Sequence, residues 1–348
     1  MSASAAALSN ESPLSPAQLR ELYGAMRLIR TVDDRMLTLQ RQGRIGFYGS
    51  CSGQEAAVIA SAYALEKSDW IFPALREGGA MLLRGFSLVS YLGQLFGNGA
   101  DVLKGRQMPS HHADKGVNQV SWSSVIGTQL PHAVGAAFAA RRLGRPDVML
   151  VHLGDGATSA SDFHSAMSFA GVWQVPVVFF CQNNHWSISL PTGKQTAAST
   201  LAAKAKGYGV PGFKIDGNDA LAVYAATKEA VGRARAGEGP TFIEAETYRI
   251  GAHSSSDDPT RYRDEREVEL WRGRDPLERM KRLLEREAGW TEAQEEALAA
   301  ELLAEVNEAL ALAEAQPNPG LSTLFDDVYA ERPWHLDEQR ERLLAGEP

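Results

Sequence analysis

The chain has 348 residues, with 35 Lys and Arg against 43 Asp and Glu, and a formal net charge of −8. This acidic balance argues against a nucleic-acid-binding protein, whose binding domain is usually basic. No stretch approaches the roughly 18 apolar residues of a membrane-spanning helix, and residues 1–19 contain no Lys or Arg, so neither a signal peptide nor an Arg-rich transit peptide is predicted. Two distant cysteines, Cys51 and Cys181, indicate neither a disulfide framework nor a zinc site. We therefore expect a cytoplasmic protein.

The first ordered element is expected just after a short N-terminal arm. Residues 1–14 are mostly small and polar, which predicts a flexible segment. Ser15 and Gln18 have the spacing of a capping box, Pro16 suits the first helical turn, and the apolar residues that follow have helical spacing. A helix is therefore predicted to begin at Ser15–Pro16.

The middle of the chain alternates β-rich and helical stretches. A β-rich run at 148–153 is followed by a Gly-containing turn, a helical stretch near 161–172 and a second run at 177–181. Strand, turn, helix and strand at this spacing form a βαβ crossover, which implies a parallel sheet with helices on its faces. Further strands are predicted at 213–216 and 242–247. We expect residues 15–264 to form one α/β domain with a doubly wound, mostly parallel sheet.

The composition changes after residue 264. The following residues are rich in charged side chains, Leu and Ala, with apolar residues at helical spacing and one β-like run at 325–328. Residues 265–348 are predicted to form a helical appendage that packs on the main domain or on a neighbouring subunit.

A candidate phosphate site follows the strand at 148–153. A glycine turn that opens a helix presents backbone N–H groups to an anion, but the dinucleotide fingerprint fails because Ser159 stands where a glycine is required. The carboxylate of Asp155 would repel a diphosphate unless a divalent cation lay between them, and Mg²⁺ prefers such oxygen ligands. Asn184 follows the next strand and would meet Asp155 at the same sheet edge. The same residues would also be found in a tight turn and a loop asparagine that bind no ligand.

Four motifs together resemble a known family. They are GRQMP at 105–109, GDGATS at 154–159, GND at 217–219 and YRIGAHSSSDD at 248–258. They resemble the α subunit of the thiamine-diphosphate-dependent branched-chain 2-oxo acid dehydrogenases over roughly residues 17–335; the pyruvate dehydrogenase α subunit is the close relative. The resemblance implies the thiamine-diphosphate-binding fold and oxidative decarboxylation of branched-chain 2-oxo acids, in the catabolism of branched-chain amino acids. It also implies acyl transfer to the lipoyl group of a dihydrolipoyl acyltransferase.

The resemblance also implies which residues bind the cofactor and its metal. Asp155 and Asn184 match the Mg²⁺ ligands of the family, and the carbonyl of Trp186 would be the third protein ligand. The remaining cofactor contacts would come from the Arg76 guanidinium, the backbone N–H groups of Gly156 and Ala157, the segment containing Ser124 and Ile126, and His253.

The sequence departs from the family at three positions near these residues. Leu75 stands where a tyrosine usually precedes the arginine, Gln182 stands where some members have arginine, and Ala252 replaces a frequent histidine. Leu75 lacks the hydroxyl of that tyrosine, and Gln182 leaves less positive charge to neutralise a phosphate.

His253 lies in a polar segment after the last predicted strand, and the matching family histidine handles protons during acyl transfer. A neutral imidazole suits that role. The next residue, Ser254, matches a serine that eukaryotic members phosphorylate, and we expect it to be unregulated here. Arg249 is expected to anchor this loop, while His111 and His112 are placed either at the substrate entry or in loop packing.

The resemblance implies that this chain supplies half of an active site. In the family the glutamate that activates the cofactor comes from a separate β chain, so an α2β2 heterotetramer is expected. Glu55 and Glu77 are candidates for that role if the chain acts alone. Three alternatives remain open: a pyruvate or acetoin dehydrogenase α subunit, a subunit that only binds nucleotide or a partner, and an NAD-dependent dehydrogenase, which Ser159 and Asp155 disfavour.

Overall fold

The computed structural model describes residues 12–346, so most of the arm predicted at 1–14 lies outside the described residues. The first helix, α1 (Pro16–Arg41), begins as predicted. The Ser15 hydroxyl accepts a hydrogen bond from the Gln18 backbone N–H, and the Gln18 side chain accepts one from the Ser15 N–H at 3.0 Å. The capping box therefore sets the start of α1.

The centre of the molecule is a five-stranded, fully parallel sheet with the strand order β1-β2-β3-β7-β6. Its strands are β1 (Trp70–Phe72), β2 (Met149–Gly154), β3 (Val177–Asn183), β6 (Gly212–Asp216) and β7 (Thr241–Glu246). The four strands predicted from the sequence are confirmed. The short strand β1 was not predicted.

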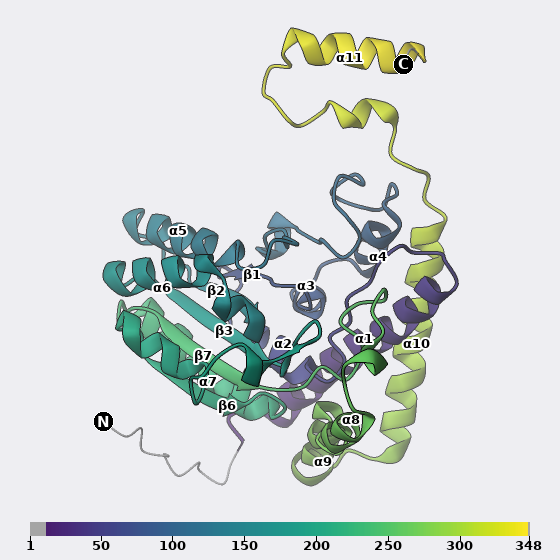
Figure 1. Ribbon diagram of the computed structural model, residues 1–348. Helices are drawn as coiled ribbons and strands as arrows, with labels where there is room; N and C mark the ends of the chain where they lie inside the picture. The colour runs from purple at the N-terminus through teal and green to yellow at the C-terminus, as the bar shows by residue number, and fades with distance from the viewer. Residues whose placement is uncertain (1–11, 347–348) are drawn as a thin grey trace.

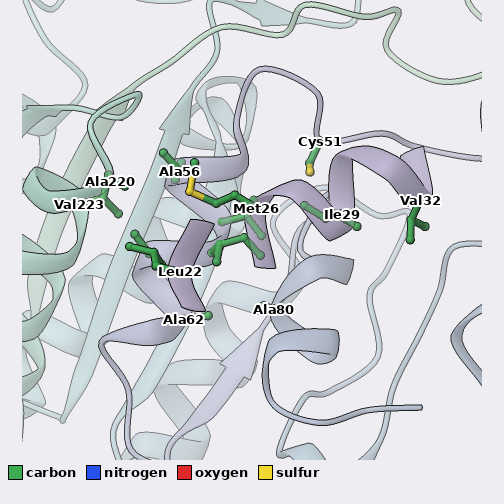
Figure 2. Packing of buried hydrophobic residues seen from close by; sticks show 14 of the residues in the cluster. Leu22, Met26, Ile29, Val32, Cys51, Ala56, Ala62, Ala80, Ala220 and Val223 are labelled. Carbon is green, nitrogen blue, oxygen red and sulfur yellow. The ribbon is translucent and has the colours of Figure 1, made fainter. Parts of the chain in front are cut away.

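Helices cover both faces of the sheet (Figure 1). Alternate strand residues point to opposite faces: Val151 packs with α5 (Gln129–Arg142) and α6 (Ser161–Trp173), whereas Leu150 packs in the cluster formed by α1, α2 (Glu55–Tyr63) and α7 (Ala220–Arg235). Figure 2 shows this second cluster. The predicted doubly wound architecture is therefore confirmed.

The winding reverses between β3 and β7. The crossover from β2 to β3 uses α6 on one face, whereas that from β6 to β7 uses α7 on the opposite face. In such sheets ligands bind outside the carboxyl ends of the strands, next to the reversal. Residues 184–211 connect β3 to β6 and leave from this edge, and they contain the hairpin of β4 (Trp186–Ser187) and β5 (Leu190–Pro191) with the short 3-10 helices Thr192–Lys194 and Ala202–Tyr208.

Helices dominate the chain after the sheet. They are α8 (Glu265–Arg272), α9 (Pro276–Ala288), α10 (Glu292–Glu314) and α11 (Trp334–Ala345). Helices α9 and α10 pack on α1, and α10 also packs on α4 (Leu88–Phe96), while α11 projects away from the body (Figure 1). The β-like run predicted at 325–328 is wrong: the segment follows a 3-10 helix, Leu321–Leu324, as turns, because no strand lies beside it to pair with. Among the described residues no helix is both long and apolar enough to cross a membrane.

Two helical glycines give matched tests of the packing. A Cβ atom at Gly171 in α6 would lie 2.1 Å from the carbonyl oxygen of Tyr208, whereas one at Gly232 in α7 would meet nothing within 4 Å. We expect Gly171→Ala to lower the free energy of unfolding by about 1–3 kcal/mol through overpacking. Gly232→Ala is expected to raise it by about 0.5–1 kcal/mol, because alanine loses less backbone entropy. Denaturant unfolding of both variants checks this; equal effects would contradict the close approach of α6 to Tyr208.

Candidate functional site

A cavity of about 140 Å³ lies at the carboxyl ends of β2 and β3. Segments far apart in the sequence form its wall, and most of the predicted site residues meet there. These are Arg76, Ile126, Asp155, Gly156, Ala157, Asn184, Trp186 and His253. Ser124 lies beside the cavity, where its hydroxyl is 2.9 Å from His111 Nε2, and its neighbour Ser123 lines the wall.

Asp155 is buried at the end of β2, in the 3-10 helix Asp155–Ser159. Its Oδ2 accepts hydrogen bonds from Thr192 Oγ1 at 2.9 Å and Gln195 Nε2 at 2.8 Å. Burial raises the pKa of this carboxyl, and the two hydrogen bonds oppose the shift. Both bonds go to one oxygen, and no other residue within 12–346 donates to Oδ1. A cation bound there would relieve the cost of burying the charge.

Asn184 and Trp186 line the same cavity as Asp155. The Trp186 backbone N–H donates to Asn184 Oδ1 at 3.3 Å, and Asn184 Nδ2 donates to Gln54 Oε1 at 3.2 Å. These two bonds fix the orientation of the Asn184 amide. The same orientation leaves Gln54 Nε2 buried without a partner among the described residues. The oxygen set of Asp155, Asn184 and the Trp186 carbonyl fits a hard divalent cation.

The backbone at Gly156 has no room for a side chain. A Cβ atom there would lie 2.2 Å from the Ser187 hydroxyl, which approaches from the β4–β5 hairpin. Glycine therefore lets the turn and the hairpin close together over one end of the cavity. Ala157 is buried beside it.

The buried side chain of Arg76 gives this part of the cavity a positive charge. The Arg76 guanidinium donates to the carbonyl oxygens of Ser50 and His253, the latter at 2.9 Å. Burial, together with repulsion from Arg249, lowers the pKa of Arg76 to about 10, so it stays charged at neutral pH. A planar guanidinium can bind two oxygens of a phosphate group.

Arg249 anchors the loop after β7, as predicted. It donates to the carbonyl of Ile188 at 2.8 Å and more weakly to that of Trp186 at 3.4 Å, and it also donates to the Tyr262 hydroxyl at 2.8 Å. Its Nε is buried with no partner among the described residues. It therefore ties the β4–β5 hairpin to the loop that contains His253.

The His253 ring lines the cavity, and its backbone is held from both ends. Its N–H donates to Asp257 Oδ2 at 2.8 Å, and its carbonyl accepts from Arg76. Burial and the positive charges of Arg76 and Arg249 lower the pKa of the ring to about 4. The imidazole is therefore neutral at pH 7 and can accept a proton.

Neither glutamate considered as an activating base has a free carboxylate. Glu55 is fully buried and bound by Arg30 and by the Gly53 N–H at 2.9 Å. Glu77 lines the cavity, but backbone N–H groups and Gln182 occupy its oxygens. Both carboxylates therefore stabilise the local fold through these contacts.

His111 and His112 lie in aromatic stacks. His111 packs against Trp122 at a tilt of 34° with ring centroids 3.8 Å apart, and His112 stacks on Tyr91 at 3.9 Å. Burial lowers the pKa of His112 to about 4. Neither ring lines the 140 Å³ cavity, which favours loop packing over a place at the substrate entry.

Two cavity features escaped the sequence analysis. Gln54 belongs to none of the quoted motifs and lies 130 positions from Asn184, so only the fold brings the two amides together. Thr192 and Gln195 lie just after the hairpin and contact Asp155. The sequence signal that could have pointed to them is that they stand in a polar segment shortly after the predicted metal ligands Asn184 and Trp186.

The sequence pattern of the dehydrogenase E1 component family matches residues 23–322. The chain is 42% identical to the mitochondrial 2-oxoisovalerate dehydrogenase subunit alpha of Homo sapiens over 96% of its own length and 76% of the relative. It is 44% identical to the 3-methyl-2-oxobutanoate dehydrogenase subunit alpha of Mycobacterium tuberculosis, over 94% of the chain and 87% of the relative. These comparisons confirm the resemblance to branched-chain 2-oxo acid dehydrogenase α subunits. The chain belongs to the dehydrogenase E1 component family.

Proposed function

We propose that this chain is the α subunit of a branched-chain 2-oxo acid dehydrogenase that depends on thiamine diphosphate and Mg²⁺. The observation that carries the proposal is that candidate metal ligands and the buried Arg76 line one cavity. The chain is also 42–44% identical to α subunits named for 2-oxoisovalerate and 3-methyl-2-oxobutanoate. Those names favour a branched-chain substrate over pyruvate or acetoin.

The metal and the diphosphate fit the residues present. Asp155 Oδ1, Asn184 Oδ1 and the Trp186 carbonyl would hold the Mg²⁺, while Arg76 would bind the diphosphate. The turn at Gly156 and Ala157 would add backbone N–H groups, and the half-exposed side chain of Ile126 would contact the apolar part of the cofactor.

The chemistry divides between the cofactor and this chain. When bound, thiamine diphosphate supplies the carbon nucleophile that attacks the 2-oxo carbon. Its ring accepts the electron pair that is left behind when CO₂ departs. The chain orients the substrate and restricts water with the apolar side chains of Leu75, Ile126 and Ile188. The neutral ring of His253 would accept a proton during acyl transfer and then return it.

A β chain is required to complete the site. Val125 and Ile126 are exposed at 66% and 58%, although both are apolar. Neither Glu55 nor Glu77 has a carboxylate free to act. A partner that covers these side chains and brings an activating glutamate would complete the site. We therefore propose an α2β2 assembly in the cytoplasm that passes the acyl group to the lipoyl group of a dihydrolipoyl acyltransferase.

Calorimetric titration of thiamine diphosphate into the chain with its β partner tests the metal site. With Mg²⁺ present we expect saturable binding; with EDTA we expect the affinity to fall at least about 30-fold, because the Asp155 carboxylate then faces the diphosphate without a cation between them. Equal affinity with and without the metal would contradict the proposal.

A further inference from the structure

The turn that carries Arg76 is held by a buried carboxylate. Glu77 is 1% exposed, and its Oε2 accepts hydrogen bonds from three successive backbone N–H groups: those of Ala74 at 2.7 Å, Leu75 at 2.9 Å and Arg76 at 3.0 Å. Its Oε1 accepts a hydrogen bond from Gln182 Nε2. The carboxylate thus joins the turn before α3 (Gly78–Leu83) to the end of strand β3.

This carboxylate forms no ion pair with a Lys or Arg side chain in residues 12–346. The nearest titratable partner is His152, whose Nδ1 lies 4.0 Å away and whose pKa is lowered by burial, so the ring is neutral. Burying a carboxylate is costly unless hydrogen bonds compensate. Here four donors do so, and three of them belong to the turn that leads into Arg76.

Helix α3 begins directly after Glu77 in tightly packed surroundings. A Cβ atom at Gly78 would lie 2.2 Å from the Tyr91 hydroxyl, and one at Gly79 would lie 2.8 Å from Ile59 Cδ1. The start of α3 is therefore pressed against the core. Arg76 is then held at both ends, its backbone by Glu77 and its guanidinium by the carbonyls of Ser50 and His253.

We propose that Glu77 is a positioning residue for diphosphate binding, which acts by fixing the backbone turn that aims Arg76 into the cavity. This inference rests on the proposed function, because it takes Arg76 to bind the cofactor's diphosphate. Gln182 is the second part of the device: its Nε2 is bound to Glu77, and its Oε1 is buried without a partner in the described part of the chain.

Because Gln182 Oε1 has no partner, Glu77→Gln can serve as a conservative variant. In Glu77→Gln, the amide oxygen can still accept from the three N–H groups, and the new NH₂ group can donate to Gln182 Oε1 after the Gln182 amide turns over. In Glu77→Leu, four buried donors lose their acceptor at similar side-chain volume. Glu77→Asp keeps the charge but shortens the reach, and it serves where Glu77→Leu does not yield folded protein.

The test measures the affinity for thiamine diphosphate with Mg²⁺ in the assembled enzyme, together with the melting temperature without cofactor. We expect Glu77→Leu to weaken binding at least tenfold, Glu77→Asp about fivefold, and Glu77→Gln less than threefold. Because Glu77 acts through Arg76, Glu77→Leu is expected to weaken binding less than twofold further in an Arg76→Ala background. Wild-type affinity in Glu77→Leu, an equal loss in Glu77→Gln, or additive losses in the double variant would each overturn the inference.

Arg76→Ala alone separates this inference from the proposed function. A loss of at least tenfold in its affinity supports the diphosphate contact, whatever the Glu77 variants do. Wild-type affinity in Arg76→Ala would instead contradict the assignment of the diphosphate site itself.

Discussion

Replacing Asp155 with alanine is expected to abolish activity of the assembled enzyme, with a loss of at least about 10³-fold in kcat/KM, which corresponds to about 4 kcal/mol. Asp155 is the buried carboxylate of the cavity whose Oδ1 is left free by its protein partners. Without it the cation loses its charged protein ligand, and the diphosphate loses the metal that joins it to the sheet edge. Steady-state kinetics with saturating cofactor and Mg²⁺, and a metal titration of each variant, check this.

Asp216→Ala is the matched control for that variant. Asp216 also lies at the carboxyl end of a parallel strand, but it is exposed on the edge strand β6 and pairs with Arg279. We expect kinetics within twofold of the wild type. Full activity in Asp155→Ala, or an equal loss in both variants, would contradict the metal site.

His253→Ala is expected to reduce the rate of acyl transfer to a lipoyl group by about 10²–10⁴-fold, the range for a lost general acid or base. The affinity for thiamine diphosphate is expected to change less than threefold, because Arg76 binds only the backbone carbonyl at this position. Decarboxylation measured with an artificial electron acceptor, against lipoyl transfer in the complete system, separates the two effects.

The pH dependence gives a second test of His253. Its folded-state pKa of about 4 lies below the ordinary value of 6.5, so the ring is neutral above about pH 5. Activity that depends on His253 should therefore show no titration of this group between pH 5 and 8, and it should fall only as the pH approaches 4. His164→Ala, an exposed histidine on α6, is the control and should leave both rates unchanged. Unaltered acyl transfer in His253→Ala would remove the residue from the mechanism.

Protonation of His253 also links pH to stability. Because the folded pKa is lowered, the unfolded chain binds a proton between pH 6.5 and 4 that the folded chain does not. The contribution of His253 to stability is therefore present above pH 6.5 and is lost as the pH falls toward 4.

The sheet and the metal turn could be predicted from the sequence because local patterns carry them. The apolar runs at 148–153 and 177–181 are long enough to read as buried strands, and Asp155 stands between two glycines directly after the first of them. Strand β1 has only three residues, so its pattern carried too little signal. The run at 325–328 had the composition of a strand but no neighbour to pair with.

The supporting contacts of the site could not be predicted because they depend on pairings between distant segments. Gln54 reaches Asn184 across 130 positions, and Gln182 reaches Glu77 across 105. The sequence marks Gln182 as a departure from the family pattern, but only the fold shows that its amide is already bound to a carboxylate. Such contacts follow from tertiary packing rather than from local spacing.

Decarboxylation of 3-methyl-2-oxobutanoate, compared with pyruvate, tests the central claim most directly. The assay uses this chain with and without its β partner, thiamine diphosphate and Mg²⁺. We predict activity only when every component is present, with kcat/KM higher for the branched acid. Higher kcat/KM for pyruvate would contradict the substrate assignment, and activity of this chain alone would contradict the shared active site.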